Sequence, residues 1–471
     1  VDGEVLVVFR QGARAAEKAG MLQAHSLSFA EAVPQTRVER LKLPEGADVE
    51  ETVEELMASG LVEHAQPNYI YRLTDFFPIA EVVRSAAANP FETWDPRQNW
   101  GLENRGQLVE TFPGYGVTGV FGVDIGAASS RDTIDGDLLE PVVVAVIDTG
   151  VDIHHPMLKD RIWTNLAELY GEPGVDDDRN GYIDDIHGWD FANDDNTVFD
   201  EPMADFHGTH VASIIAGMAD HAMIMPLKFV GNGSTGTTLH AVSAIQYAVK
   251  MGAKISNNSW SGTQKDELLR GAIQESDMLF VVAAGNGDKF GEGLNIEEIP
   301  RYPASFNHPN QINATAVGPN GNIAKFSNYG ENIVHLAAPG VAIYGAVPGG
   351  ILPNTYYYYF DGTSQAAPYV AGAAALAMGM MRLGILETKE LLLHSAKTLP
   401  SLSGKVMNGA FLSADLAQSV RDLQVELDDP KEFKNSGVTV SFRTGPYGGL
   451  RAEKDVVVRR LDGMDADRVT S

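Results

Sequence analysis

The alternation of apolar and polar positions in residues 1–73 predicts a small α+β unit at the start of the chain. Short segments rich in Val and Leu, one of them alternating with charged residues, are typical of strands, and the segments between them have helical spacing. Asp48 is placed to cap the second helix. The expected elements are strands at residues 4–10, 38–43 and 61–73, with helices at residues 11–22 and 48–59. This order suits an open sheet with two helices on one face, and by composition alone an ordinary α+β binding module fits it equally well.

Continuous apolar runs later in the chain predict strands that are buried on both faces, as in a parallel sheet. Two such runs lie at residues 141–147 and 278–284, and a further buried strand is expected at residues 254–257. A helical pattern at residues 266–275 separates the last two strands. This alternation predicts an α/β domain with helices on both faces of a parallel sheet. Sites in such sheets lie at the carboxyl ends of the strands, where Asp148 and Asn286 occur.

Ser364 is predicted to lie in an exposed turn at the start of a buried helix. Aromatic residues at 356–360 indicate a strand before it, and small apolar residues at 366–378 predict the helix behind it. Pro368 is expected in the first helical turn, where a missing amide proton removes no hydrogen bond. The helix N-terminus favours developing negative charge, so Ser364 is a candidate nucleophile, although a structural serine fits the same pattern.

His207 precedes another helical pattern, and we expect it to be exposed at that helix N-terminus, with Gly208 allowing close backbone approach. A zinc site of the His-Glu-x-x-His type is disfavoured, because the pair His207 and His210 lacks the glutamate, and His210 is expected to be structural. Other candidates also have a purely structural interpretation. Asp148 is able to cap the turn that follows it, and Asn286 belongs to a residue type that tolerates left-handed geometry.

Composition narrows the classes of function. The chain has 471 residues, enough for two or three domains, and it carries 63 acidic against 35 basic residues for a net charge of −28. This charge argues against nucleic acid or an anionic membrane as a partner. It is typical of adaptation for solubility, and the alternatives are a salty environment or a preference for cationic substrates. The sequence holds no cysteine, which excludes disulfides, thiolate zinc sites and thiol catalysis.

Four short motifs together resemble the signatures of the subtilisin-like serine proteases, in that family's order of Asp, His and Ser. They are Val-Ile-Asp-Thr-Gly-Val at 146–151, His-Gly-Thr-His-Val-Ala at 207–212, Ala-Ala-Gly-Asn at 283–286 and Gly-Thr-Ser-Gln-Ala-Ala-Pro at 362–368. The resemblance implies a subtilisin-like catalytic domain at residues 94–421. It also implies a triad of Asp148, His207 and Ser364, with Asn286 as the side-chain donor to the oxyanion.

The resemblance further implies how substrates bind. Peptides are expected to add as a strand between two backbone rails, with a specificity pocket beside them. The implied substrate-binding residues are Gly233, Ser234, Gly236, Ser259, Trp260, Ser261, Gly262, Ala284 and Gly285. The chain departs from the family where Gln365 stands in place of a common methionine. It also departs between Gly217 and Met225, where a longer calcium-binding loop is common and that calcium site is expected to be absent.

Residues 62–70 are similar to the end of the inhibitory propeptides of this family. The resemblance therefore implies that residues 1–73 are a ferredoxin-like propeptide domain that acts as an intramolecular inhibitor. Residues 74–93 have the composition of a linker and are expected to hold the processing site. Residues 422–471 are predicted to be a C-terminal extension with short strands, to which no function is assigned.

The acidic segment at residues 176–185 matches the start of a calcium loop. Oxygen-bearing side chains occupy positions 1, 3 and 5 and glycine occupies position 6, although His187 rather than glutamate falls at position 12. The expected ligands are Asp176, Asp178 and Asn180, the carbonyl oxygen of Tyr182, and Asp184 or Asp185. The alternative is a solvated acidic turn without a cation.

The leading hypothesis is a secreted, monomeric serine endopeptidase that acts on proteins or peptides and is made as a zymogen. The chain begins at Val1 rather than methionine, and we take it to have lost a leader. An alternative is an autoinhibited or inactive homologue that serves as a binding protein. An esterase or lipase is disfavoured, because Ser364 does not lie in a Gly-x-Ser-x-Gly elbow.

Overall fold

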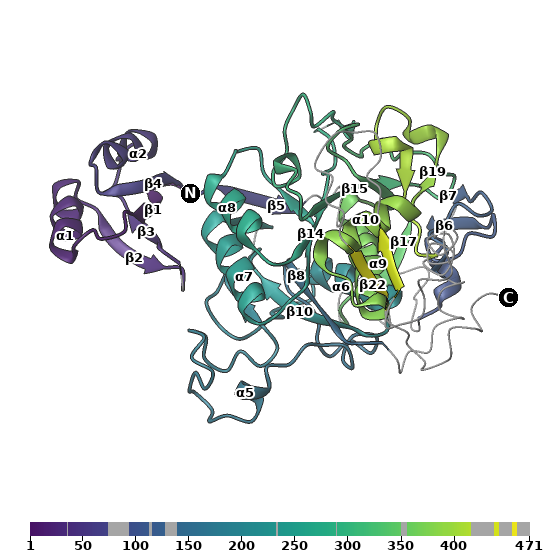
Figure 1. The fold of residues 1–471 in the computed structure, drawn as a ribbon, viewed down its shortest axis with the longest axis horizontal. Coiled ribbons are helices and arrows are strands. Elements are labelled where there is room, and N and C mark those ends of the chain that lie inside the picture. The colour runs from purple at the N-terminus through teal and green to yellow at the C-terminus, as the bar shows by residue number, and fades with distance from the viewer. Residues whose placement is uncertain are drawn as a thin grey trace.

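The computed structural model describes residues 1–34, 36–73, 94–112, 115–127, 139–231, 234–288, 290–349 and 356–415, with two short strands nearer the C-terminus. A small N-terminal domain stands beside a larger domain that carries the parallel sheet (Figure 1). The strand β5 (Ile70–Leu73) leads from the first domain into the second. The whole predicted linker at residues 74–93, and the end of the predicted catalytic domain, lie outside the described residues.

The small domain is an antiparallel sheet with strand order β2-β3-β1-β4, packed against two helices. Its elements are β1 (Glu4–Phe9), α1 (Ala15–Ala24), β2 (Ser28–Ala32), β3 (Val38–Lys42), α2 (Val49–Ala58) and β4 (Val62–Pro67). Alternate residues of β1, namely Val5, Val7 and Phe9, enter a core with Met21 of α1 and Leu56 of α2. The expected ferredoxin-like arrangement is confirmed.

Two details of this domain differ from the sequence prediction. Strand β2 was not predicted, because it is an edge strand whose side chains are all at least partly exposed, so it carries no apolar alternation. The single strand expected at residues 61–73 is two strands. β4 pairs with β1 in the small sheet, whereas β5 leaves that sheet and pairs within the large domain.

The large domain is built on a nine-stranded sheet, counted over the described residues, with order β19-β20-β16-β15-β14-β12-β8-β10-β9. All neighbouring pairs are parallel except β19 with β20. The strands are β8 (Val142–Asp148), β9 (Trp189–Asp190), β10 (Ala222–Lys228), β12 (Ile255–Asn258), β14 (Leu279–Ala283), β15 (Gln311–Val317), β16 (Leu336–Pro339), β19 (Lys397–Thr398) and β20 (Ala410–Phe411). The continuous apolar runs of β8 and β14 are buried, as a sheet covered on both faces requires.

Helices flank this sheet, which confirms the expected α/β architecture built on a parallel sheet (Figure 1). They are α5 (Leu166–Leu169), α6 (Phe206–Met218), α7 (Thr238–Lys250), α8 (Glu267–Glu275), α9 (Thr363–Met381) and α10 (Ile385–Ser395). α6 packs against α9, and α7 packs against α8. Residues 363–379 of α9 are all buried, because its small side chains allow the helix to pass through the core.

Shorter elements complete the described chain. The hairpins are β6 (Leu108–Phe112) with β7 (Tyr115–Thr118), β17 (Ile343–Ala346) with β18 (Tyr357–Phe360), and β21 (Val438–Ser441) with β22 (Asp455–Val458). The last pair agrees with the strands expected in the C-terminal extension. Two further strands, β11 (Thr235–Thr237) and β13 (Trp260–Ser261), lie on either side of β5. The 3₁₀ turns are Pro96–Gln98, Ala304–Phe306, Pro400–Leu402 and Met407–Gly409.

Among the described helices, none is by itself long and apolar enough to cross a bilayer. α9 and α10 reach that length and composition only as a pair, and they are bent by 114° at the break between them.

The close contact of α9 with α6 gives a prediction about stability. A Cβ atom added at Gly372 of α9 would lie 2.5 Å from Met218 Cβ, whereas one added at Gly271 of α8 would have no heavy atom within 4 Å. We expect Gly372→Ala to lower the free energy of unfolding by about 1–3 kcal/mol, as overpacking does. Gly271→Ala should raise it by up to about 1 kcal/mol, because alanine is the better helix former. Thermal unfolding measures both, and an increase for both variants would contradict the packing described.

Candidate active site

The end of β8 and the start of α6 bring two buried side chains together. His207 Nδ1 lies 2.6 Å from Asp148 Oδ1, and these side chains are 1% and 0% exposed. Asp148 is the last residue of β8, and its Oδ1 also accepts a hydrogen bond of 2.7 Å from the Thr149 amide. The carboxylate therefore selects the tautomer that keeps the proton on Nδ1. The expectation that His207 is exposed is wrong, because tertiary packing covers the N-terminus of α6.

Gly208 allows this meeting of strand and helix, as expected from the sequence. A Cβ atom at this position would lie 2.2 Å from the carbonyl oxygen of Gly150 and 3.2 Å from Asp148 Oδ1. The Gly208 amide instead donates to Thr149 Oγ1 at 3.0 Å. Only glycine lets the first turn of α6 approach the end of β8 so closely.

His210 has a structural environment, also as expected. It is fully buried, and its Nε2 lies 3.2 Å from the carbonyl oxygen of Ile343 and 3.3 Å from that of Tyr358. Burial lowers the pKa of His210 to about 3, so the ring is neutral at ordinary pH and ties α6 to the β17–β18 hairpin.

Ser364 lies in the first turn of α9 and exchanges two hydrogen bonds with Ser259, which precedes β13. Ser364 Oγ donates to the Ser259 carbonyl oxygen at 3.3 Å, and Ser259 Oγ donates to the Ser364 carbonyl oxygen at 3.0 Å. The helix begins at Thr363, so Pro368 lies in its second turn and not in the first. Since Pro368 has no amide proton for the carbonyl four residues before it, Ser259 supplies the missing donor to Ser364. Ser364 is 0% exposed, so the expected open position is also wrong for this form of the chain.

Asn286 follows β14 and is held by the residue before Ser364. Its Oδ1 accepts hydrogen bonds from the amide of Thr363 at 2.9 Å and from Thr363 Oγ1 at 2.8 Å. Thr363 Oγ1 in turn accepts from the Gly285 amide at 3.1 Å. Asn286 Nδ2 is buried and has no hydrogen-bond partner among the described residues. Thr363 was not among the predicted site residues, although it stands inside the Gly-Thr-Ser motif.

A second residue that sequence reasoning missed, Asn328, supports the turn after β14. Its Nδ2 donates to the Ala284 carbonyl oxygen at 2.9 Å, and its Oδ1 accepts from the Gly287 amide at 2.9 Å. Gly285 has a φ of +95°, and a Cβ atom there would lie 2.6 Å from Asn328 Nδ2. The predicted pocket residues Ala284 and Gly285 are thus held rigidly, but no sequence motif identifies the residue that holds them.

The two predicted substrate rails have a strand of the chain's own N-terminal part between them. β11, β5 and β13 form an antiparallel sheet in which Tyr71 pairs with Gly236, Arg72 pairs with both Thr235 and Ser261, and Leu73 pairs with Trp260. The further rail residues Ser234 and Gly262 flank these strands, and Gly233 lies outside the described residues. Trp260 is buried and donates from Nε1 to the Ile147 carbonyl oxygen at 3.0 Å, which fixes its rail to the end of β8.

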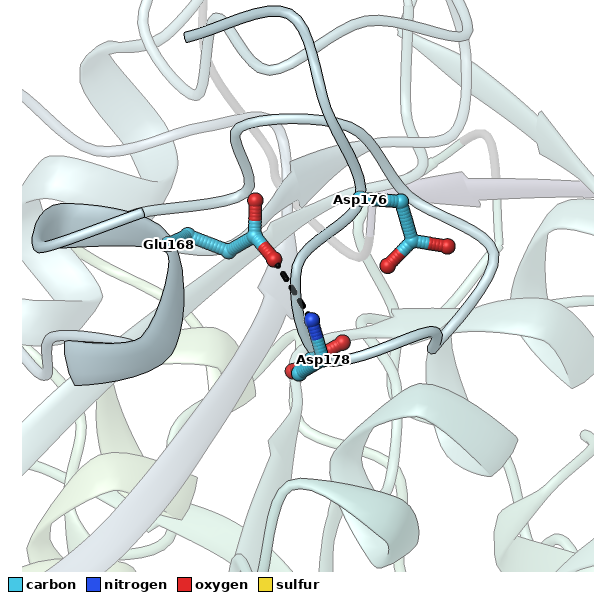
Figure 2. Close-up of side chains that lie close together, drawn as sticks. All are labelled: Glu168, Asp176 and Asp178. Atoms are coloured by element: carbon cyan, nitrogen blue, oxygen red, sulfur yellow. Dashed lines mark hydrogen bonds between the residues drawn. The ribbon is translucent and has the colours of Figure 1, made fainter. Parts of the chain in front are cut away.

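Three carboxylates gather at the acidic loop. Oxygen atoms of Glu168, Asp176 and Asp178 lie within 4.8 Å of one another (Figure 2). Glu168 belongs to α5 and is 4% exposed, and its Oε1 accepts hydrogen bonds from the amides of Asp177 and Asp178 at 2.8 and 3.1 Å. The grouping fits a hard cation that prefers oxygen ligands. Glu168 was missed because it lies before the loop, in a separate helix.

The other predicted ligands lie outside this group of carboxylates. Asp185 is fully buried and accepts hydrogen bonds from Asn180 Nδ2 at 2.8 Å, from Asn165 Nδ2 at 3.1 Å and from the Tyr247 hydroxyl. Burial raises the pKa of Asp185 to about 6. The Asp184 carboxylate accepts from the Gly174 amide at 2.8 Å, and the Tyr182 side chain packs among aromatic rings. Asp185 therefore orients Asn180 within the loop.

Comparison with known proteins finds a family model for each of the two domains. The model of the subtilase family matches residues 140–423, and the model of the fervidolysin N-terminal prodomain matches residues 1–68. The thermophilic serine proteinase of Bacillus sp. (strain AK1) is 31% identical over 391 residues, which are 80% of this chain and 78% of that protein. Subtilisin-like protease 1 of Plasmodium vivax is 28% identical over 309 residues, or 60% of this chain and 48% of that protein. The chain thus spans about half the length of the Plasmodium relative.

Among solved structures, the chain resembles fervidolysin from Fervidobacterium pennivorans, a keratinolytic enzyme related to subtilisin. The TM-score is 0.64 at 23% identity, over 88% of this chain and 61% of that chain, which is a likeness of fold. The two family models show that the chain belongs to the subtilase family and carries an N-terminal prodomain of the fervidolysin type.

Proposed function

We propose that the chain is the precursor of a serine endopeptidase in which Asp148, His207 and Ser364 form the catalytic triad. The main support is the buried hydrogen bond between His207 Nδ1 and Asp148 Oδ1, on a helix that packs against the one carrying Ser364. The side-chain amide of Asn286 supports the same assignment, because its oxygen is held by Thr363 while its buried nitrogen has no partner among the described residues.

The proposed reaction is acyl transfer to water. Ser364 Oγ attacks the carbonyl carbon of the peptide bond while His207 Nε2 accepts its proton. Asp148 holds the imidazole tautomer and stabilises the imidazolium that forms. The amide of Asn286 and the backbone N–H of Ser364 donate hydrogen bonds to the oxyanion. His207 then protonates the leaving amine, and a water molecule hydrolyses the acyl-enzyme by the reverse sequence of proton transfers.

The prodomain is proposed to inhibit this site until it is removed. Strand β5 pairs with β11 and β13 by backbone hydrogen bonds, the mode in which a substrate peptide would bind. The substrates are therefore proteins or peptides in extended conformation, and processing is expected within residues 74–93. We further propose that the enzyme is secreted, because a covered site would keep it latent before it leaves the cell, and that it acts as a monomer.

A calcium ion is proposed to stabilise the acidic loop. Glu168, Asp176 and Asp178 would hold it, since three carboxylates so close together repel one another without a cation. Asn180, the carbonyl oxygen of Tyr182 and Asp184 are candidates for the remaining ligand positions. The ion would order the loop and take no part in the reaction.

Self-processing tests the proposed function. The native chain, incubated alone, should be cleaved between residues 73 and 95 and should then hydrolyse casein, whereas Ser364→Ala should do neither. Gel electrophoresis with mass spectrometry of the fragments measures the self-cleavage. The release of labelled casein fragments measures the hydrolysis of casein. A native chain that stays intact and leaves casein untouched would favour the autoinhibited or inactive homologue instead.

Asn286→Ala should lower kcat by about two to three orders of magnitude with little change in KM, because only the transition state carries the oxyanion. Thr363→Val removes one of the two hydrogen bonds to Asn286 Oδ1 and should give a smaller loss of kcat. Steady-state kinetics on a chromogenic peptide measures both effects. Unchanged kcat in Asn286→Ala would remove this residue from the site.

Calcium should raise the melting temperature of the Ser364→Ala chain, because a ligand that binds only the folded state stabilises it. Glu168→Gln should abolish most of the increase, whereas Asp277→Asn, which removes an exposed carboxylate outside the acidic loop, should leave it intact. Differential scanning calorimetry across a calcium titration provides the measurement. A melting temperature that does not respond to calcium would leave the loop as a solvated acidic turn.

A further inference from the structure

Strand β5 fills one subsite of the cleft with the side chain of Tyr71. This side chain is 1% exposed, and its ring meets the ring of Trp260 edge-on, with centroids 5.0 Å apart and an interplanar angle of 71°. A Cβ atom added at Gly262 would lie 3.0 Å from two carbons of the Tyr71 ring. The subsite therefore has room for an aromatic ring because residue 262 is glycine.

A carboxylate lies at the base of this subsite. The Tyr71 hydroxyl donates to Asp266 Oδ2 at 2.8 Å, and Asp266 is 0% exposed. Asp266 Oδ1 accepts from the Leu269 amide at 2.9 Å, as the N-cap of α8, and from Gln66 Nε2 at 2.8 Å. The Thr238 hydroxyl also donates to Oδ2. Two of the four donors thus come from the prodomain, and the other two from the catalytic domain.

Removal of the prodomain would leave this carboxylate with fewer donors. Asp266 would keep the Leu269 amide and the Thr238 hydroxyl but would lose Gln66 and Tyr71. A bound side chain that returns a hydroxyl to the same place restores a hydrogen bond to a charged group. A phenylalanine would instead bury the carboxylate against the apolar edge of its ring. Burial and the Asp266 carboxylate also raise the pKa of Tyr71 well above its usual value, so the hydroxyl remains a donor.

The strand register places this subsite relative to the bond that is cleaved. Leu73 pairs with Trp260, and Arg72 pairs with Ser261. A substrate that continues in this register brings its next residue opposite Ser259, whose carbonyl oxygen lies 3.3 Å from Ser364 Oγ. That residue supplies the carbonyl group for attack, so the side chain in the Tyr71 subsite stands three residues before it.

We propose that Asp266 makes this subsite selective for tyrosine, so that the enzyme prefers substrates with tyrosine three residues before the one whose carbonyl is attacked. This inference rests on the proposed endopeptidase function and adds a specificity-determining residue to it. The phenol hydroxyl selects through its hydrogen bond to the carboxylate, and the ring binds between Trp260 and Gly262.

Two peptides that differ only in tyrosine or phenylalanine at this position test the proposal. The processed native enzyme should cleave the tyrosine peptide with a kcat/KM about tenfold to a hundredfold higher. Asp266→Ser, which keeps a residue type able to cap α8, should bring the ratio close to one. Glu267→Gln removes the neighbouring carboxylate, which faces Lys265 and Arg270, and should keep the native ratio. Equal cleavage of both peptides by the native enzyme would overturn the proposal.

A second measurement does not depend on catalysis. In the Ser364→Ala chain, Tyr71→Phe should speed amide hydrogen exchange at residues 70–73 by about tenfold, because β5 loses its bond to Asp266. The same change in an Asp266→Ser background should have no further effect. An equal increase in both backgrounds would show that the hydroxyl and the carboxylate are not coupled. If the native enzyme cleaves neither peptide, the proposed function itself is contradicted. The hydrogen-exchange rates of the Tyr71→Phe variants with and without Asp266→Ser would still decide whether Asp266 selects the hydroxyl.

Discussion

A hydrogen bond between two buried side chains, His207 Nδ1 and Asp148 Oδ1, joins the end of strand β8 to the start of α6. A charged carboxylate in a dry interior is costly unless it is paired, so the surrounding structure has to hold its partner in place. The sheet supplies the carboxylate at its carboxyl edge, and Gly208 lets the helix come close enough to supply the ring. Helix α9, packed on α6, then brings Ser364 to the same edge of the sheet.

The same edge of the sheet binds the prodomain strand. β5 completes a three-stranded sheet with β11 and β13, and Gln66 and Tyr71 saturate a carboxylate that the catalytic domain satisfies only in part. Backbone pairing is indifferent to sequence, whereas a buried carboxylate at the base of a subsite is not. The prodomain contacts thus display, within one chain, the kind of side chain that this subsite accepts.

Three adjacent strands of the nine-stranded sheet, β8, β12 and β14, could be predicted from sequence. β8 and β14 leave continuous apolar runs because both of their faces are buried, and the four motifs mark the strand and helix ends that carry chemistry. The rest depends on tertiary contacts. An extended pattern over residues 61–73 does not say that its two halves join different sheets. No local sequence pattern predicts the burial of His207, the position of Pro368 within α9 or the contribution of Glu168 to the acidic loop. In the sequence, Asp266 was only the first residue of a predicted helix, since its contact with Tyr71 requires the prodomain to be docked.

The central claim is that Ser364 is the nucleophile, activated by His207 and covered by the prodomain until processing. Covalent labelling with a fluorophosphonate, followed by mass spectrometry of the digested chain, tests it most directly. The account predicts a label on Ser364 alone, appearing only in the processed chain and absent in His207→Ala. If the uncleaved chain is labelled as fast as the processed chain, the prodomain does not cover Ser364. If the processed chain carries no label on Ser364, this residue is not the nucleophile.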